Sequence, residues 1–249
     1  MQLNAQVDRE EALAFLGHAG QTLDDSMTER LERAAQLCEN ELRPRGTWCV
    51  LPTNQALALL PGRDIARHVE GCTEVVLMAV TLGAESEQML RRERALSPTD
   101  GLLVDACASS LVEQAANGLN AVVREQAAAR DMAVTSRFSP GYGDLPLSCQ
   151  PAFLNACGAG KTLGLHVTSA NLLVPTKSIT AVIGLKPAVT TEKSAASSSD
   201  GAFDASAFDN AQAVAPDDVA SVDPRCDVCS LATTCALRAQ GRTCHGTFT

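Results

Sequence analysis

An arginine, a glycine and the only tyrosine of the chain fall within six residues of one another, at Arg137, Gly141 and Tyr142. Pro140 and two glycines within residues 137–144 allow neither a helix nor an interior strand, so this stretch is predicted to be a loop. A guanidinium can hold a carboxylate in two parallel hydrogen bonds, a glycine lets backbone groups approach a ligand, and a phenol supplies an apolar face with a polar tip. These residue types fit an amino-acid-like ligand, but composition alone favours an ordinary surface turn.

A second candidate site is a group of four cysteines in the last 24 residues, with the pattern Cys226-x2-Cys229-x5-Cys235-x8-Cys244. Short loops limit the entropy of bringing such ligands together, so four thiolates can close around one metal centre. Zinc would form a redox-silent knuckle, whereas a 4Fe-4S cluster would use the same sulfurs and carry electrons. The alternative is four free thiols in a mobile tail. The scattered cysteines are predicted to be small buried hydrophobic residues: Cys38, Cys49, Cys72, Cys107, Cys149 and Cys157.

The sequence Gly-Ala-Gly-Lys-Thr at 158–162 imitates the end of a phosphate-binding P-loop. The full pattern needs a glycine five positions before Gly160, where this chain has Asn155. The preceding residues look helical, whereas a P-loop follows a buried strand. We therefore expect Gly158 and Gly160 to end a helix, and we expect no ATP or GTP site here.

Composition narrows the class of protein. The chain has 249 residues, of which 45% are hydrophobic and 20% charged, so it can bury a sizeable core. It has no apolar run long enough to span a membrane and no secretory signal, so we expect a soluble, cytoplasmic protein without a membrane partner. A net charge of -9 and 3% aromatic residues argue against nucleic acid as a partner.

Three segments are predicted along the chain. Residues 188–224 contain seven acidic residues and one lysine among Ala and Ser, and such a segment cannot bury enough apolar surface to fold. We read it as a flexible linker between a globular body, residues 1–187, and the Cys-rich metal-binding tail, residues 225–249.

The body is predicted to be an α+β domain with helices around a largely antiparallel, twisted sheet. Apolar residues at three- and four-residue spacing predict a helix over 24–42. Ser97 and Pro98 are typical of a helix start, and a helical pattern continues to about Arg130. Segments rich in Val, Ile, Leu and Thr predict strands over 47–51, 74–82, 166–174 and 178–185.

Arg137-x-x-Pro140-Gly141-Tyr142, followed by Pro146, resembles the RxxPGYxxxP loop of the activation domain of cobalamin-dependent methionine synthase. Residues 105–113 resemble that family's helix with a ligand-binding glutamate, and residues 173–184 resemble its last strand region. The three motifs occur in the family's order, and the likeness spans about residues 95–187.

The resemblance implies that the body binds S-adenosylmethionine. Arg137 would bind the methionine carboxylate, and Glu113 would lie near the ligand's amino group or sulfonium. Ser139 and Gly141 would offer main-chain contacts, and Tyr142 would line the pocket. Two positions depart from the family. The family's histidine that faces the corrinoid falls at Ser148 of this chain, and its ligand-lining tyrosine falls at about Ile179.

The implied function is that of a free-standing reactivation subunit, because the chain contains no Asp-x-His-x-x-Gly motif for a cobalamin of its own. It would support reductive methylation of cob(II)alamin on a separate partner, either a methionine synthase core or another corrinoid methyltransferase, with an electron donor. In this context an iron-sulfur cluster is favoured over zinc for the tail. The alternative is a non-catalytic adaptor of a corrinoid protein with a structural zinc knuckle.

Overall fold

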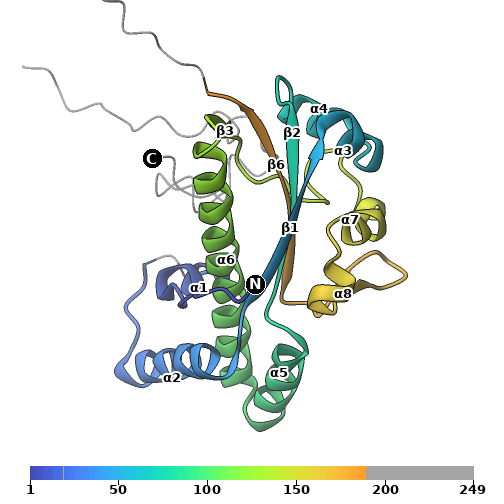
Figure 1. The fold of residues 1–249 in the computed structure, drawn as a ribbon. Helices are drawn as coiled ribbons and strands as arrows, with labels where there is room; N and C mark the ends of the chain where they lie inside the picture. Colours follow the sequence, from blue (N-terminus) through green and yellow to red (C-terminus); the bar gives the residue numbers. More distant parts are fainter. Residues whose placement is uncertain (19, 189–249) are drawn as a thin grey trace, which may run out of the picture. The chain divides into compact units, whose positions relative to one another are not determined.

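A computed structural model describes residues 1–18 and 20–188 of the chain (Figure 1). Its centre is an antiparallel sheet of four strands in the order β1-β2-β6-β3. The strands of this sheet are β1 (Arg45–Pro52), β2 (Glu74–Thr81), β6 (Ser178–Pro187) and β3 (Met132–Val134). The predicted α+β class is confirmed.

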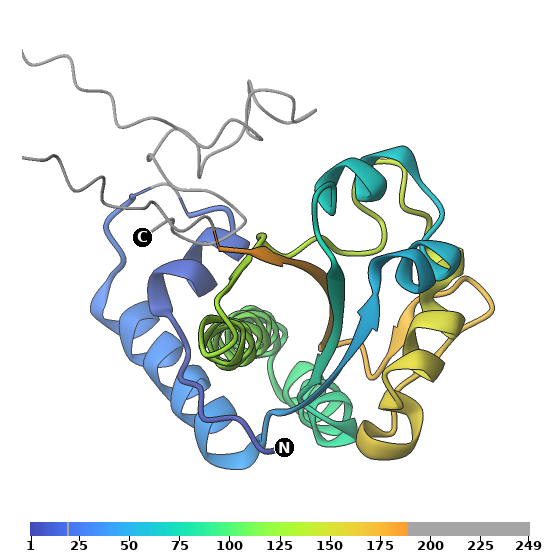
Figure 2. The ribbon, with the colours of Figure 1, turned by 45° about the horizontal axis from the view of Figure 1, so that its top comes forward.

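Helices cover both faces of the sheet. The long α6 (Pro98–Ala128) crosses one face, with α1 (Arg9–Phe15), α2 (Asp25–Glu41) and α5 (Ala84–Leu96) packed beside it (Figure 2). The opposite face is covered by α3 (Thr53–Leu59), α4 (Arg63–His68), α7 (Gln150–Ala156) and α8 (Ala159–Leu163). The sheet thus separates two hydrophobic cores.

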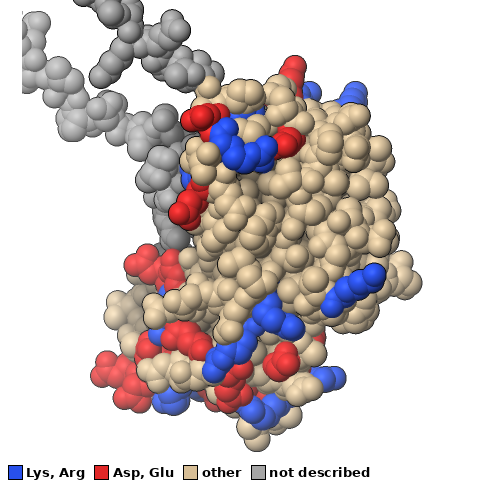
Figure 3. Space-filling view, viewed as in Figure 1, with Lys and Arg blue, Asp and Glu red and all other residues tan. Residues whose placement is uncertain are grey.

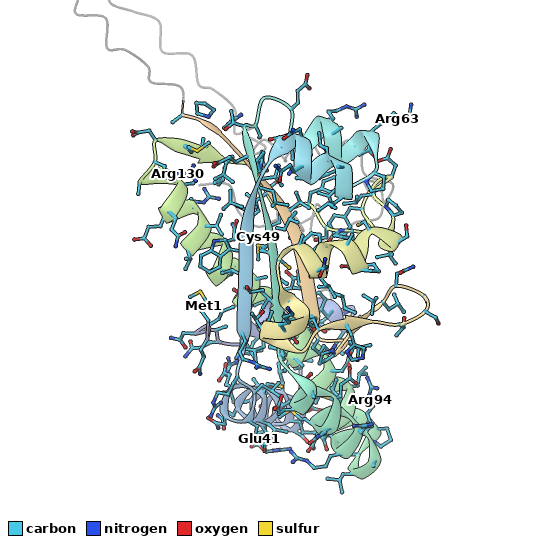
Figure 4. All side chains as sticks on the ribbon, turned by 45° about the vertical axis from the view of Figure 1, so that its right-hand side comes forward. Met1, Glu41, Cys49, Arg63, Arg94 and Arg130 are labelled. Carbon is cyan, nitrogen blue, oxygen red and sulfur yellow. The ribbon has the colours of Figure 1, made fainter. Side chains whose placement is uncertain are left out.

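Strand alternation assigns each residue of β6 to one of these cores. Ala181 and Ile183 are buried on the α6 side, whereas Val182 is buried on the α7 side. Cys49 of β1 also packs on the side of α7 and α8 (Figure 4). This alternation matters for the site, because neighbouring residues at the start of β6 face different helices.

The helix α6 begins where the sequence predicts. The Ser97 hydroxyl accepts a hydrogen bond from the Asp100 N–H at 3.3 Å, and Pro98 is the first helical residue. The helix ends at Ala128, two residues before the predicted end. The prediction for 24–42 is likewise confirmed as α2, with Asp24 as the capping residue.

One predicted strand is wrong. Residues 166–174 form a hairpin of two short strands, β4 (His166–Val167) and β5 (Leu173–Val174), and not a continuous strand. The chain reverses between them, where the Thr168 N–H bonds the Leu172 carbonyl at 2.9 Å and Asn171 has a φ of 60°. The other predicted strands correspond to β1, β2 and β6.

The segment that imitates a P-loop follows a helix, as expected. α7 ends at Ala156, and Gly158 has a φ of 65°, which is typical of a residue just beyond a helix end. The expectation for Gly160 is wrong, because it lies inside the five-residue α8.

The scattered cysteines are confirmed as packing residues. All are buried except Cys49, which is half-buried. Burial raises the pKa of Cys107 to about 12 and that of Cys157 to about 11, so both thiols stay protonated at neutral pH. The tail cysteines and the predicted linker beyond Ala188 lie outside the described residues. No helix in the described part of the chain has the length and apolar character needed to cross a bilayer.

Candidate functional site

The first half of β6 has an open side. β3 pairs only with the far end of β6, between Leu185 and Pro187. Nearer the middle, Phe138 makes an isolated bridge with Val182, through N–H to carbonyl bonds of 2.9 and 2.8 Å. No described strand pairs with Ser178, Ile179 and Thr180 on that side. The sheet therefore offers an unpaired edge next to the loop predicted to bind a ligand.

A cavity of about 380 Å³ lies at this edge. It reaches around both faces of β6, because Glu113 comes from α6 on one side and Gln150 from α7 on the other. The loop after β3, the hairpin β4–β5 and the start of β6 complete its walls. The residues around it are Glu113, Ser139, Pro140, Tyr142, Leu147, Gln150, Asn171, Leu172, Leu173, Thr176, Ser178, Ile179 and Thr180.

The glycine-rich loop is fixed to the start of α4. The Asp144 carboxylate accepts hydrogen bonds from the N–H groups of Arg63 at 2.8 Å and Asp64 at 3.0 Å. In return the Asp64 carboxylate accepts from the Asp144 N–H at 3.1 Å. The N–H groups of Asp64 and Arg63 hold the pKa of Asp144 below its ordinary value. Gly143 passes so close to Asp64 that a Cβ atom would collide with its carboxylate.

Within the loop, backbone bonds set which groups remain for a ligand. The Gly141 N–H donates to the Leu145 carbonyl at 2.8 Å, and the Tyr142 N–H donates to the Ser139 carbonyl at 3.0 Å. These bonds occupy two of the main-chain groups at this turn. The Tyr142 ring meets Phe138 edge-on, with centroids 6.2 Å apart, and is 46% exposed at the cavity.

Arg137 is held against α6 beside the cavity. Its Nη2 donates to Oε2 of Glu113 at 3.2 Å and to Oδ1 of Asn117 at 2.9 Å. The Arg137 side chain is 12% exposed and that of Glu113 is 37% exposed. Glu113 and Asn117 are four residues apart on one helical face, which explains how both reach one guanidinium. An ion pair with partial access to solvent therefore lies at one end of the cavity.

The opposite wall, around Thr176, is fixed by charged groups. The Glu87 carboxylate accepts a hydrogen bond from the Thr176 N–H at 2.6 Å, and this bond lowers the pKa of Glu87. Next to it, Nζ of Lys177 lies 2.7 Å from the Ser109 hydroxyl and 3.2 Å from the Asp105 carboxylate. These contacts attach the turn before β6 to α5 and α6.

Two buried polar side chains lie on the α7 side of the cavity. The Thr180 hydroxyl donates to Oε1 of Gln150 at 3.0 Å, and each residue is 3% exposed. Neither residue belongs to a motif that the sequence alone reveals. Gln150 reads as a polar helix start and Thr180 as a strand residue, so neither carries a local signal of function.

The structure brings the predicted site residues of the body close together, but they differ in their position relative to the cavity. Glu113, Ser139 and Tyr142 line the cavity, whereas Arg137 and Gly141 lie beside it and are not among the lining residues. In the described part of the chain, no group of three or more His, Cys, Asp or Glu side chains is arranged to hold a metal ion. The four predicted metal ligands of the tail lie outside that part.

Most charged side chains are remote from the helices α7 and α8. Between residues 145 and 176 the chain has a single Asp, Glu, Lys or Arg, namely Lys161. The surface over α7 and α8 accordingly shows little charge, whereas charged groups gather over α2 and α5 (Figure 3). Leu172, at the tip of the hairpin and 55% exposed, adds an apolar group to the rim of the cavity.

No protein-family model and no curated protein matches the sequence. Among solved structures, the chain is similar to a crystal structure of the MetH reactivation domain bound to AdoHcy, with 18% identity, a TM-score of 0.54, and coverage of 73% of this chain and 74% of that one. It also matches the structure of CLA-ER, an enone reductase of gut-bacterial fatty acid saturation metabolism, with 9% identity over 82% of this chain and 95% of that one. The TM-score of that match is 0.32, which is too low to support a shared fold. The chain therefore has the fold of the MetH reactivation domain.

Proposed function

We propose that residues 1–188 bind S-adenosylmethionine and act as a reactivation module for a separate corrinoid protein. The observation that carries this proposal is the cavity at the open edge of β6, which has an Arg137–Glu113 ion pair at one end and apolar walls beyond it. The fold shared with a domain crystallised with AdoHcy supports the same ligand class.

The charges at the cavity end suit the amino-acid part of such a ligand. Its carboxylate would take the guanidinium of Arg137, and its ammonium group would take the carboxylate of Glu113. Both hydrogen bonds of Arg137 use Nη2, so Nε and Nη1 have no partner among the described residues and can meet a carboxylate. Binding would thus replace one ion pair by two.

The loop would supply the remaining contacts. Because the Gly141 N–H and the Ser139 carbonyl already bond within the loop, we assign the Ser139 N–H and the Gly141 carbonyl as the main-chain groups for the ligand. The exposed ring of Tyr142 would cover the bound molecule.

In this proposal the chain's own residues position the ligand and exclude water. Methyl transfer from the sulfonium to re-reduced cobalt is chemistry that the ligand and the partner's corrinoid supply. Glu113 would orient the charged half of the ligand, and the apolar rim at Tyr142 and Leu172 would face the partner. The surface around α7 and α8, where Lys161 is the single charged residue between residues 145 and 176, supports docking of a protein through apolar contacts (Figure 3).

For the tail we propose that Cys226, Cys229, Cys235 and Cys244 bind one metal centre, with a 4Fe-4S cluster favoured over zinc because reactivation needs an electron. Residues 188–224 would be the linker that connects this centre to the body. Anaerobic absorption spectroscopy with iron, sulfide and zinc analysis of the full chain tests this part by itself.

The proposed function is tested with a corrinoid methyltransferase core whose cofactor has been oxidised to cob(II)alamin. With a chemical reductant and methyl-labelled S-adenosylmethionine, the wild-type chain should remove the cob(II) paramagnetic signal and transfer label to the corrinoid. Arg137→Ala should slow both, whereas Arg124→Ala, an exposed arginine on α6, should not. If the chain binds the core without S-adenosylmethionine and no label is transferred, the adaptor alternative is correct.

A further inference from the structure

We propose that Gln150 and the backbone of Thr180 recognise the adenine ring of the bound nucleoside and make the pocket specific for it. This inference rests on the proposed function and extends it, since that function assigns the ligand's charged end only. The residues that carry it, Gln150 and Thr180, lie on the α7 side of the cavity.

The side-chain amide of Gln150 can donate a hydrogen bond to a ligand in the cavity. Its Oε1 accepts the Thr180 hydroxyl, and no described residue bonds its Nε2. Among the described residues, Oδ1 of Asn120 is the one side-chain oxygen or nitrogen that is both fully buried and without a hydrogen-bond partner, so Nε2 of Gln150 is not such an atom. Nε2 of Gln150 is therefore not sealed from solvent, although the residue as a whole is only 3% exposed. Since Gln150 lines the cavity, this donor opens onto it.

The backbone groups of Thr180 point toward the same cavity. The N–H and carbonyl of Val182 both bond Phe138, on the side of β6 away from β2. In an antiparallel strand, the backbone groups of residues two apart point to the same side. The N–H and carbonyl of Thr180 therefore point to the open edge, where no described residue hydrogen-bonds them, and Thr180 also lines the cavity.

Together these groups offer two N–H donors and one carbonyl acceptor next to the apolar side chains of Leu147 and Leu173, which also line the cavity. A purine with an exocyclic amino group complements this set, since adenine has ring-nitrogen acceptors beside an amino donor on a flat apolar ring. Ribose fits it less well, because its two hydroxyls would have to share the Thr180 carbonyl and the remaining lone pair of Oε1 of Gln150, and it has no flat apolar ring. The geometry thus assigns the base to the α7 side and the amino acid to the α6 side.

Hypoxanthine tests this arrangement because it replaces the amino group of adenine with a carbonyl. That oxygen would face the Thr180 carbonyl, and two acceptors without a proton between them are both left unsatisfied. We expect the wild-type chain to bind S-adenosylhomocysteine at least about tenfold more tightly than S-inosylhomocysteine, since an unsatisfied buried group carries a penalty of that order.

The experiment is calorimetric titration of both compounds into the full-length chain and three variants. Gln150→Glu keeps the shape and the bond to Thr180 but replaces the donor with an acceptor, so we expect at least a tenfold loss of affinity for S-adenosylhomocysteine, roughly the effect of one lost buried hydrogen bond. Thr180→Val removes the hydroxyl that orients the amide, and we expect a smaller loss. Gln36→Glu, on the exposed surface of α2, adds the same charge elsewhere and should bind as wild type does.

Thermal melting by circular dichroism establishes that each variant is folded, and the comparison of the two compounds in the wild-type chain needs no variant. Equal wild-type affinity for the two compounds, or wild-type affinity in a folded Gln150→Glu chain, would overturn the base assignment while leaving the proposed function intact. If the wild-type chain binds neither compound, the proposed function and this inference both fail.

Discussion

Asp64 and Asp144, which are 80 residues apart in sequence, each accept a hydrogen bond from the backbone N–H of the other, at 3.0 and 3.1 Å. The Asp144 carboxylate also accepts from Arg63, at the start of α4 and far from the Arg94 end of the molecule (Figure 4). The loop that carries Tyr142 is therefore fastened to a helix on the far side of the sheet from α6. Its position at the cavity depends on this junction.

The first prediction concerns the pH dependence of this junction. The pKa of Asp144 is below its ordinary value of 3.8, so the ionised group stabilises the folded state. This stability is present above the unfolded-state pKa and is lost as the pH falls through the lower folded-state pKa. Asp144→Asn lacks the charge and one acceptor, so it should be less stable than wild type at neutral pH, and the difference should shrink toward about pH 3.

Urea unfolding midpoints of the two proteins, measured from neutral pH to about pH 3, check this expectation. A difference that stays constant across the series would show that the charge of Asp144 does not stabilise the junction.

The second prediction compares two glycines. Gly143 has a φ of 50°, and a Cβ there would meet the Asp64 carboxylate, so Gly143→Ala should detach the loop and weaken ligand binding. Gly118 lies within α6, where the nearest atom to an added Cβ is 3.8 Å away. Gly118→Ala should therefore raise stability, by about 0.5–1 kcal/mol, and leave binding unchanged.

Melting temperatures and titrations of S-adenosylhomocysteine measured on both variants separate the two effects. The interpretation of the loop is wrong if Gly143→Ala binds as well as Gly118→Ala does.

The third prediction concerns thiol reactivity. Burial raises the pKa of the thiols of Cys38 and Cys107, so alkylation near pH 8 should spare them in the folded protein. The tail cysteines should react first once any bound metal has been removed, and slowly while a metal is bound. Mass spectrometry of the labelled peptides gives the order, with denatured protein as the control in which all ten cysteines react. Rapid labelling of Cys107 in folded protein would contradict the packing described for α6.

The fourth prediction is that a chain ending at Ala188 folds alone. Both hydrophobic cores consist of residues before Ala188. The Ala188 N–H donates a hydrogen bond to the Asp131 carbonyl at 2.8 Å, which fixes the end of this part of the chain. The truncated protein should melt cooperatively, within a few degrees of the full chain. A broad, non-cooperative melt would mean that residues beyond 188 belong to the fold.

Local signals explain which parts of the fold were predictable. α6 has its cap, its first-turn proline and its apolar spacing within one segment, and β2 is an apolar run bounded by polar residues. The hairpin β4–β5 was misread because its ends contain strand formers, while the turn residues 168–171 between them were given too little weight. α5 was not predicted, since Met89 and Leu90 are its main buried apolar side chains among many charges.

The site also has parts that local sequence signals reveal and parts that they do not. The loop around Tyr142 is evident from its proline and glycines, and Glu113 and Asn117 share a helical face that spacing can reveal. The partner of Asp144 and the Gln150–Thr180 contact depend on residues brought together by the tertiary fold, 80 and 30 positions apart. No local pattern encodes such contacts, which is why the α7 side of the cavity was missed.

The most direct test of the account is calorimetric titration of S-adenosylmethionine into the full-length chain, with Arg137→Ala and the exposed-surface control Arg124→Ala beside it. The account predicts saturable binding by wild type and by the control. It predicts a loss of about tenfold or more in Arg137→Ala, because a charge-assisted hydrogen-bonded pair contributes about 1.5–3 kcal/mol. Absence of saturable binding to wild type, or undiminished binding by a folded Arg137→Ala chain, would contradict it.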